Sequence, residues 1–352
     1  MAYSVLGDRV SCTNMAATST TNQPTPLAFF EAANAFHKSA ALRTALELDV
    51  FTAVADGATT PAALAGKCNA SERGMRILCD FLTVEGFLRK SGSVYSLPQE
   101  SAMFLSRRSP AFVGSMIFFL THQAQLDRFC DLTNAVRNGG TRDATEIETD
   151  HPMWVEFARS MAAMMFMPAQ EIADLLGAGK GEPWKVLDVA AGHGIFGIAV
   201  ARNNPNASVV ALDWPHVLQV AREHASQMGV AARHSTIEGD ALTVNWGEGY
   251  DVVLLTNFLH HFDKAACEQI LGKAYAALKP GGRVAILEFV PNDDRVSPPR
   301  AASFPLVMLA NTPAGDAYTF REIEAMVSAA GLTVATRHEL SNGVETVVIA
   351  TK

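Results

Sequence analysis

The stretch "VLDVAAGHG" (186–194) joins a β-branched run to a second apolar run, "IFGIAVA", and this junction decides how the second half of the chain is interpreted. It predicts a strand that ends near Asp188 and a helix that begins after Gly194. In doubly wound sheets, ligands bind at the carboxyl ends of the strands, beside a glycine-rich first turn. Gly192 and Gly194 would let such a ligand approach the backbone. Glycines in a strand–helix turn often serve the turn alone, so the junction does not by itself establish a binding site.

Beyond Trp184 the sequence changes to short β-branched runs. Helical stretches alternate with the first four of them, which predicts βαβ units and a parallel sheet covered on both faces. One helix is expected to end at Lys279, before a turn through Pro280, Gly281 and Gly282. The runs are "KVLDVA" (185–190), "ASVVAL" (207–212), "YDVVLLT" (250–256), "RVAILEFV" (283–290) and "ETVVIATK" (345–352).

The first part of the chain has helical periodicity instead, with apolar residues at spacings of three and four from Pro26 onward. "GFLRKSGSVYSL" (86–97) holds two apolar arms around Ser91–Ser93 and predicts a hairpin after a helix-turn-helix, which is the winged-helix pattern. The expected organisation is a disordered tail (1–24), a winged-helix domain (25–110), connecting helices (111–182) and a sheet domain (183–352). Breaks are expected at Gly139–Gly140 and His151–Pro152, and the domain boundary in "GAGKGEP" (177–183).

The composition limits the classes of function. Charged residues make up 18% of the 352 residues, against about 25% in typical domains, which suits a subunit that buries surface against a partner. The formal net charge of -8, without a run of Lys and Arg, argues against a nucleic-acid partner. Five scattered cysteines without a CxxC pair argue against a disulfide framework and favour a reducing, cytoplasmic setting. No apolar run is long enough to predict a membrane span.

Three carboxylates follow successive predicted strands. Asp188 ends the first strand, Asp213 lies 25 positions later at the end of the second, and Asp240 follows the third. At these places Asp213 could accept both hydrogen bonds of a ribose diol, and Asp240 could accept one from an adenine amino group. Each aspartate alone would more often cap a helix. The absence of GxGxxG and GxxxxGK[ST] argues against a nicotinamide dinucleotide and a P-loop nucleotide.

Six motifs occur in an order and spacing that resembles class I S-adenosylmethionine-dependent methyltransferases. They are "VLDVAAGHG", "ALDWPHV", "EGDAL", "LHHFDKAACEQIL", "LKPGGRVAILE" and "TFREIEAMVSAAGL". More narrowly, residues 25–352 resemble the O-methyltransferases of the caffeic-acid and acetylserotonin type, including their N-terminal winged-helix dimerisation domain. The resemblance implies a Rossmann-like catalytic domain, a homodimer, S-adenosylmethionine as cofactor, S-adenosylhomocysteine as product, and no metal.

The resemblance also assigns residues to the cofactor. Its methionine part is expected to contact Asp188, Ala190, Gly192 and Gly194. Its ribose is expected to contact Asp213, and its adenine Trp214, Asp240 and Ala241, with Asn257 completing the set. Ala190 replaces the family's first glycine, and its methyl group would be tolerable if its φ were negative.

A second constellation is "TNFLHHFDKAAC", in which His260 falls on the position of the family's general base and Cys267 on a later family cysteine. A phenol (pKa about 10) and a histidine (about 6.5) are close enough for proton transfer as the methyl group moves. Glu288 matches one of two family acids that orient this base. The second acid is replaced by Ala317, so Asp316 is the nearest carboxylate that could serve. A lone buried histidine is otherwise often a hydrogen-bonded core residue.

Side chains that would contact the acceptor are expected from several segments. Phe157, Met161 and Met164 lie on a methionine-rich helix that by resemblance borders the acceptor pocket, although such a stripe is as often core packing. His261 stands where the family usually has an acid, and could bind substrate or compete for the role of base. A metal site at His260, His261 and Asp263 is disfavoured, because adjacent helical residues point about 100° apart. Further pocket candidates are Phe118, Phe119, His122, Phe304 and Met308.

These features predict a homodimeric enzyme that methylates a small aromatic hydroxyl. A carbon or nitrogen acceptor, methylated by proximity alone, stays open because of Ala317. A cofactor-binding relative with other chemistry also stays open, since fold alone does not define function. A DNA-binding regulator is disfavoured by the acidic balance and by the poor basic content of "NASERGMRILCDFL" (69–82), in which Arg73 and Arg76 are the only basic residues.

Overall fold

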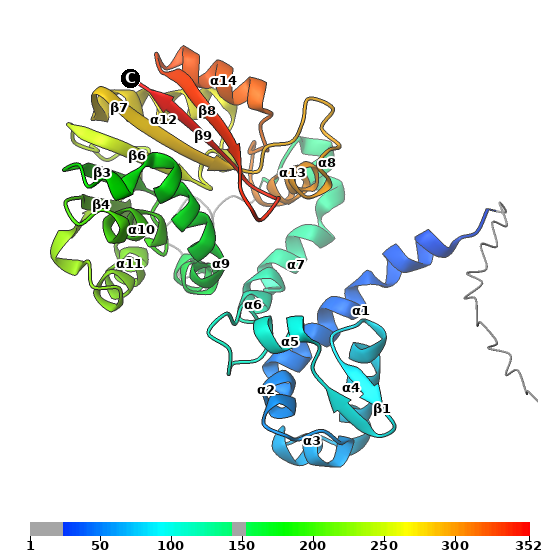
Figure 1. Cartoon of the computed structure of the whole chain (residues 1–352). Coiled ribbons are helices and arrows are strands. Elements are labelled where there is room, and N and C mark those ends of the chain that lie inside the picture. The colour runs from blue at the N-terminus through cyan, green and yellow to red at the C-terminus, as the bar shows by residue number, and fades with distance from the viewer. Residues whose placement is uncertain (1–23, 143–152) are drawn as a thin grey trace, which may run out of the picture.

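The computed structural model describes residues 24–142 and 153–352. They form a helical N-terminal lobe and a C-terminal lobe built on a sheet, and helices α6 (Met116–Leu120) and α7 (Gln123–Cys130) lie between them (Figure 1). The expected tail lies outside the described residues except for Pro24, and so does the expected break at His151–Pro152. Within the described ranges, no helix combines the length and apolar character needed to cross a bilayer.

The N-terminal lobe contains the helices and the hairpin that the sequence predicts. Two of its helices begin where Thr60 and Ser71 accept hydrogen bonds from the backbone N–H groups of Ala63 and Gly74. The hairpin strands pair antiparallel on either side of the predicted turn. The elements are α1 (Leu27–Glu47), α2 (Val50–Ala55), α3 (Pro61–Lys67), α4 (Glu72–Val84), β1 (Arg89–Ser91), β2 (Val94–Ser96) and α5 (Gln99–Phe104).

The C-terminal lobe contains a sheet of strand order β5-β4-β3-β6-β7-β9-β8. The first five strands in this order are parallel, whereas β9 is antiparallel to both of its neighbours, so the sheet is mixed rather than wholly parallel. The five predicted runs are all strands, and β5 is the strand expected before Asp240, but β8 is not predicted. The bounds are β3 (Lys185–Val189), β4 (Ser208–Asp213), β5 (His234–Glu238), β6 (Tyr250–Thr256), β7 (Leu278–Glu288), β8 (Thr333–Glu339) and β9 (Thr346–Thr351).

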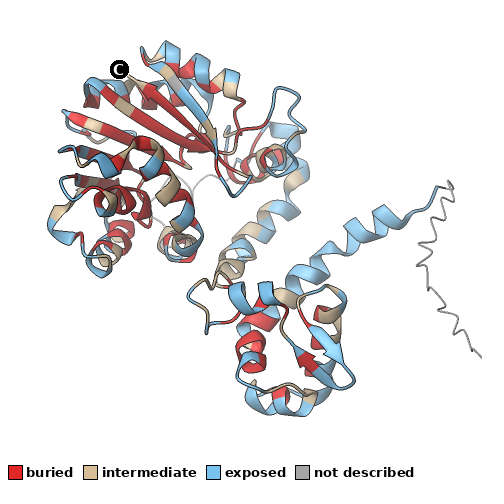
Figure 2. Ribbon diagram, in the orientation of Figure 1, coloured by how far each residue is buried: buried red, intermediate tan, exposed pale blue. Residues whose placement is uncertain are grey.

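Helices cover both faces of this sheet, and its strands are mostly buried (Figures 1 and 2). One face packs against α12 (Lys264–Ala277) and α14 (Phe320–Ala329). The other packs against α9 (Met153–Leu176), α10 (Ile195–Asn203) and α11 (Pro215–Gln227). Helix α12 ends two residues before the expected Lys279, because Leu278 already pairs with Tyr250 in the sheet. With both faces covered, a ligand can approach only at the ends of the strands.

Helices α7 and α8 (Leu132–Asn138) pack against α13 (Pro299–Asn311), where the Arg128 guanidinium donates a 2.9 Å hydrogen bond to Asn311 Oδ1. The predicted break at Gly139–Gly140 is confirmed, since α8 ends there with Gly139 at φ 80°. A Cβ on Gly140 would lie 2.1 Å from the carbonyl oxygen of Pro313. Only glycine therefore allows the chain after α8 to approach the chain after α13.

The turn after β3 contains three left-handed residues, with φ of 52° at Ala190, 55° at Gly192 and 72° at Gly194. The condition under which alanine would be tolerable at position 190, a negative φ, is therefore not met. Two backbone hydrogen bonds hold the turn: Ala191 N–H donates to Leu212 O (3.0 Å), and Gly194 N–H donates to Ala191 O (2.7 Å). A left-handed alanine costs roughly 1–2 kcal/mol, because its Cβ crowds the carbonyl oxygen.

Replacing Ala190 with glycine should raise the free energy of unfolding by about 0.5–1 kcal/mol, which is the relieved strain less the larger entropy that glycine loses on folding. Denaturant unfolding of the two proteins measures this difference. Ala191→Gly is the matched control: Ala191 is buried and has no positive φ, so the same change should destabilise the protein. Equal destabilisation by both substitutions would show that Ala190 is not strained.

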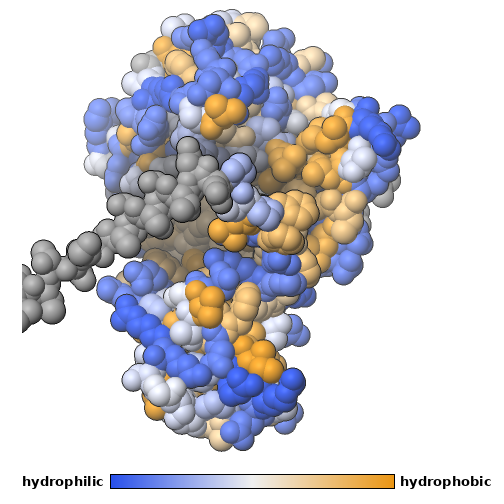
Figure 3. Space-filling view, turned by 90° about the vertical axis from the view of Figure 1, so that its right-hand side faces the viewer, coloured by the Kyte–Doolittle hydropathy of each residue, from blue (hydrophilic) through white to orange (hydrophobic). Residues whose placement is uncertain are grey.

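Helix α1 projects from the N-terminal lobe and is exposed along much of its length (Figures 1 and 2). Phe29 is 70% exposed, Phe30 54% and Phe36 65%. Figure 3 views this side of the molecule, and hydrophobic residues gather around a recess between the two lobes. Large apolar surfaces of this kind usually mark an interface.

We expect the protein to be a dimer in which a second copy covers α1. Light scattering at micromolar concentration should give twice the chain mass, because stable interfaces of this kind often bury more than about 2,000 Å². The double substitution Phe29→Ser and Phe36→Ser should shift the protein to monomer. Val296→Ser is the control, since Val296 is 74% exposed but lies in the other lobe. A wild-type monomer at this concentration would contradict the expectation.

Candidate active site

Asp188 lies in β3, fully buried under the first turn of α10. Its Oδ2 accepts a hydrogen bond from Gly197 N–H (2.9 Å), whereas its buried Oδ1 has no partner. The pKa of Asp188 is raised to about 7, mainly by burial. The hydrogen bond from Gly197 lowers it and the nearby Asp213 carboxylate raises it. An unpaired carboxylate oxygen near the glycine turn fits a ligand that brings a hydrogen-bond donor or a positive charge.

Asp213 ends β4 and fastens the glycine turn to that strand. Its Oδ2 accepts a hydrogen bond from Gly192 N–H and its Oδ1 accepts one from Trp214 N–H, each at 2.7 Å. The carboxylate therefore fixes the position of the turn, a function that the sequence does not predict. Its place at the strand end is the predicted one.

The loop after β5 carries the residues expected to contact adenine. Asp240 Oδ1 accepts a hydrogen bond from Leu242 N–H (2.8 Å) and so stabilises the loop itself. From α12, the Lys273 ammonium donates to the carbonyl oxygens of Ala241 (2.7 Å), Leu242 (2.9 Å) and Val244 (3.0 Å). The half-buried Trp214 packs with residues of α9 and α11. Lys273 is thus a positioning residue for this loop that the sequence analysis missed.

The predicted pair His260 and Glu288 is in direct contact and buried. His260 lies in the short helix η3 (Leu259–His261), and its Nδ1 is 2.6 Å from Glu288 Oε2. Glu288 Oε1 accepts hydrogen bonds from the backbone N–H groups of Phe258 (3.1 Å), Leu259 (2.8 Å) and His260 (3.3 Å). Glu288 thus holds both the ring and the backbone of this turn. With Nδ1–H donating to the carboxylate, Nε2 is left as the basic nitrogen of the ring.

Aromatic rings from four helices and the end of β7 form a continuous row, here called the ring row. Its successive centroid distances lie in the range typical of aromatic contacts or shorter. All of its members except His260 are half-buried. The row runs Phe119–Phe157 (4.9 Å), Phe157–Trp154 (5.8 Å), Trp154–His261 (6.1 Å), His261–His260 (4.3 Å), His260–Phe304 (4.9 Å) and Phe304–Phe289 (3.8 Å).

His261 is placed between His260 and Trp154, and its buried Nδ1 has no hydrogen-bond partner. Burial lowers the pKa of His261 well below its ordinary value, and the neighbouring His260 lowers it further. The ring is therefore neutral at physiological pH. A neutral His261 lines the site without adding a positive charge beside His260.

Several predicted pocket residues lie elsewhere or have other partners. Phe118 packs against the core of the N-terminal lobe, with the Arg43 guanidinium 5.7 Å from its ring centroid. His122 is exposed and caps α7 through a 3.3 Å hydrogen bond from Ala124 N–H. Met161 packs against the core between α9 and the sheet, Met164 is 38% exposed, and Met308 is buried in α13. None of these residues is a member of the ring row.

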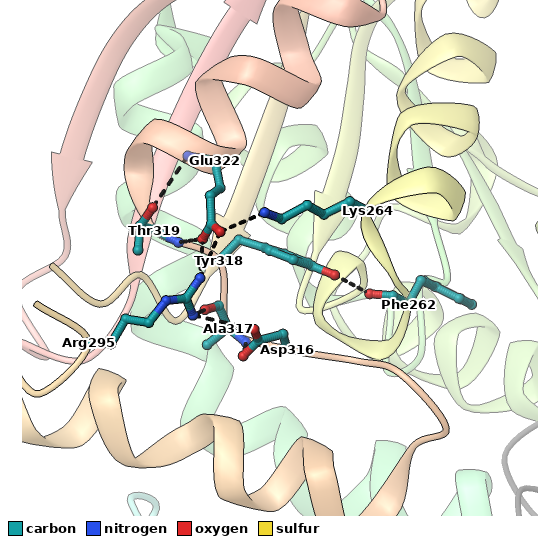
Figure 4. A network of polar contacts seen from close by, with 8 residues as sticks. All are labelled: Phe262, Lys264, Arg295, Asp316, Ala317, Tyr318, Thr319 and Glu322. Carbon is teal, nitrogen blue, oxygen red and sulfur yellow. Dashed lines mark hydrogen bonds and ion pairs between the residues drawn. The ribbon is translucent and has the colours of Figure 1, made fainter. Parts of the chain in front are cut away.

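The segment that should carry a second acid is held by a separate ionic network (Figure 4). Arg295 donates to Asp316 (3.3 Å), to the Ala317 carbonyl (3.4 Å) and to both oxygens of Glu322 (2.7 and 2.6 Å). Lys264 also binds Glu322, at 2.7 Å. Asp316 is therefore paired with Arg295 rather than with His260, and Ala317 brings no carboxylate.

The side chains of His260, His261 and Asp263 do not form a metal site either. Asp263 caps α12, since its Oδ1 accepts a 2.8 Å hydrogen bond from Ala266 N–H. In the parts of the chain that the structure describes, no three His, Cys, Asp or Glu side chains are grouped to hold a metal ion.

Two ring-row members, Trp154 and Phe289, are functional candidates that the sequence analysis missed. Glu345 is a third: it is buried, and its Oε1 accepts a 3.0 Å hydrogen bond from the Asn257 side chain. Trp154 is one turn before Phe157 on the same helix, and Phe289 follows Glu288 directly, so their positions in sequence could have indicated them. Glu345 had no such signal.

Comparison with known proteins places this geometry in a family. The model of the O-methyltransferase dimerisation domain matches residues 30–107, and that of the O-methyltransferase domain matches residues 132–333. The chain is 29% identical to the acetylserotonin O-methyltransferase of Mus musculus, over 87% of this chain and 83% of that protein. It is 27% identical to the 3-hydroxy-5-methyl-1-naphthoate 3-O-methyltransferase of Streptomyces sahachiroi, over 82% and 84%.

Solved structures agree with this fold. A protein of Nostoc punctiforme, described as a candidate O-methyltransferase, is 50% identical, with a TM-score of 0.90 over 94% of this chain and 100% of that chain. An O-methyltransferase family protein of Burkholderia thailandensis is 25% identical, with a TM-score of 0.80 over 94% and 98%. The resemblance inferred from the sequence is confirmed: the chain belongs to the O-methyltransferase family, with a dimerisation domain followed by an O-methyltransferase domain.

Proposed function

We propose that the protein transfers a methyl group from S-adenosylmethionine to the hydroxyl oxygen of a small aromatic acceptor, with His260 as the general base. The observation that supports this most directly is the 2.6 Å contact of His260 Nδ1 with Glu288 inside the ring row. Half-buried aromatic side chains suit a flat aromatic acceptor. Two relatives are named for hydroxylated bicyclic aromatics, acetylserotonin and a hydroxynaphthoate, which supports the same acceptor class.

The cofactor fits the carboxyl edge of the sheet. The unpaired Asp188 Oδ1 and the left-handed turn through Ala190, Gly192 and Gly194 suit its methionine part. Asp213 suits the ribose, and the loop of Asp240 and Ala241, with Trp214 and Asn257, suits the rest. When bound, S-adenosylmethionine supplies an electrophilic methyl group and leaves as S-adenosylhomocysteine.

The chain's own residues handle the proton. His260 Nε2 accepts it from the acceptor hydroxyl, and the oxygen's electron pair becomes available for the new bond to carbon. Glu288 then stabilises the imidazolium through Nδ1, because a carboxylate favours the charged ring. His261 is neutral and does not oppose this charge. Phe304 and Phe289 flank His260 and keep its surroundings apolar, which strengthens the ion pair.

A second function is supported by Ala317, which stands where the family has an acid. If the acceptor is already ionised, or is a carbon or nitrogen atom, alignment alone would suffice. Labelled S-adenosylmethionine should be incubated with N-acetylserotonin, a hydroxynaphthoate, simple phenols and aromatic amines, and label followed into product. Label in the hydroxylated compounds alone supports O-methylation.

His260→Ala should lower turnover of a non-ionised phenol about 10²–10⁴-fold, because the proton loses its acceptor. Glu288→Gln should cause a smaller loss, since the ring remains but is held less well. His261→Ala should cost less than His260→Ala, and His122→Gln, at an exposed position, is the control. An equal loss on ionised and non-ionised phenols at every pH would reject His260 as the base.

Asp213→Ala should weaken cofactor binding by about 1.5–3 kcal/mol, the usual range for hydrogen bonds to a charged group. Isothermal calorimetry with S-adenosylhomocysteine measures this directly. Asp213→Asn keeps one acceptor oxygen for the turn, so it should lose less affinity for the cofactor than Asp213→Ala. Glu238→Gln, an exposed change at the end of β5, should bind as the wild type does. Wild-type affinity in Asp213→Ala would remove Asp213 from the site.

A further inference from the structure

A second buried carboxylate lies beside the His260–Glu288 pair. Glu345 immediately precedes β9 and is 3% exposed. Its Oε1 accepts a hydrogen bond from Asn257 Nδ2 (3.0 Å), and its Oε2 accepts one from Asn342 Nδ2 (2.8 Å). Its backbone N–H donates to Asn342 Oδ1 (3.2 Å). Both oxygens thus accept from amide donors, an arrangement suited to the ionised form.

The sheet places Glu345 next to the proposed base. Glu288, the last residue of β7, is paired with Thr346 of the antiparallel strand β9. Glu345 precedes Thr346 in the sequence, so it lies one position beyond this pair. Asn257 begins the connection from β6 to η3, and its own N–H is bonded to Leu287 O (2.8 Å). The amide of Asn257 therefore links the Glu345 carboxylate to the turn that carries His260.

We propose that Glu345 is a positioning residue of the active site, which provides the second negative charge beside His260 that Ala317 cannot provide. The inference rests on His260 being the general base. As the acceptor's proton moves to His260 Nε2, the imidazolium faces two carboxylates, Glu288 in direct contact and Glu345 behind Asn257. The proton stays on His260, and Glu345 acts through charge and through the position of the turn.

The electrostatics of Glu345 support this coupling. Burial is the main effect and raises the pKa of Glu345, and Glu288 raises it further, whereas the hydrogen bonds from Asn257 and Asn342 and the charge on His260 lower it. A protonated His260 and an ionised Glu345 therefore favour one another. Two other titratable groups interact with this cluster, namely His261 in the same turn as His260, and Cys267 of α12 beside Glu288.

The test is Glu345→Gln, a nearly isosteric change that removes the charge and replaces one acceptor oxygen with an amide donor. Protein labelled at the histidine ring carbon would be titrated by NMR without any acceptor, with the His260 signal assigned by its absence in His260→Gln. The midpoint of the His260 titration should fall by about 0.5–1 pH unit, because a nearby carboxylate favours the imidazolium. Glu171→Gln is the matched control: Glu171 binds Ser341 in the same β8–β9 turn, away from His260. An unchanged midpoint in folded Glu345→Gln would overturn the inference.

A second variant guards against a misfolded Glu345→Gln. Asn342→Ala removes one donor from Glu345 at an exposed turn position, and should shift the midpoint in the same direction by a smaller amount. If Glu345→Gln does not fold and Asn342→Ala causes no shift, the inference is overturned.

Turnover of the best acceptor separates this inference from the proposed function. Glu345→Gln should lower kcat several-fold in the wild type and have no further effect in His260→Ala. An equal effect in both backgrounds would make Glu345 merely structural. If His260→Ala itself keeps full activity, the proposed function fails, while the titration still decides whether Glu345 sets the charge on His260.

Discussion

The carboxylate of Glu288 is the group on which the site depends. It accepts three backbone N–H groups with one oxygen and the His260 ring with the other, so it joins the end of β7 to the connection between β6 and α12. A buried charge is tolerable only when it is fully hydrogen-bonded, and here four donors satisfy it. Without this carboxylate the three buried N–H groups would have no hydrogen-bond partner, and each would destabilise the fold by about 1–3 kcal/mol. The orientation of His260 is therefore built into the fold of the sheet.

The cofactor edge is built on the same principle. Asp213 binds the N–H of Gly192 across two strands, so a carboxylate at one strand end fixes the turn at its neighbour. The strain at Ala190 is held in place by this bond and by the Ala191 N–H to Leu212 contact. In both places an acidic side chain, Glu288 or Asp213, fixes the backbone through hydrogen bonds from N–H groups. The same backbone is thereby held at the edge where a ligand would bind.

Much of this could be predicted where the signal is local in sequence. The β3 turn and the strand-end aspartates follow from motifs of a few residues. The contact of His260 with Glu288 joins residues 28 positions apart, and it was expected only from the family resemblance. The sequence did not predict strand β8, because it is an edge strand with mostly polar, exposed residues. The antiparallel direction of β9 depends on which strands it pairs with, and the hydrophobic pattern of the sequence does not indicate that. The φ of Ala190, the pairing of Asp316 with Arg295, and the placement of Glu345 beside Asn257 depend on contacts between distant segments, which periodicity cannot indicate. The catalytic and binding roles themselves stay predictions.

The ring row has an evolutionary consequence. Its members come from α6, α9, η3, α13 and the end of β7, and only His260 among them is held by Glu288. Phe119 and Phe157, at one end of the row, contact each other and Trp154, and the contact of Glu288 with His260 does not involve their side chains. A gene duplicate could therefore acquire a new acceptor by changing these two side chains while its proton-transfer machinery is inherited intact.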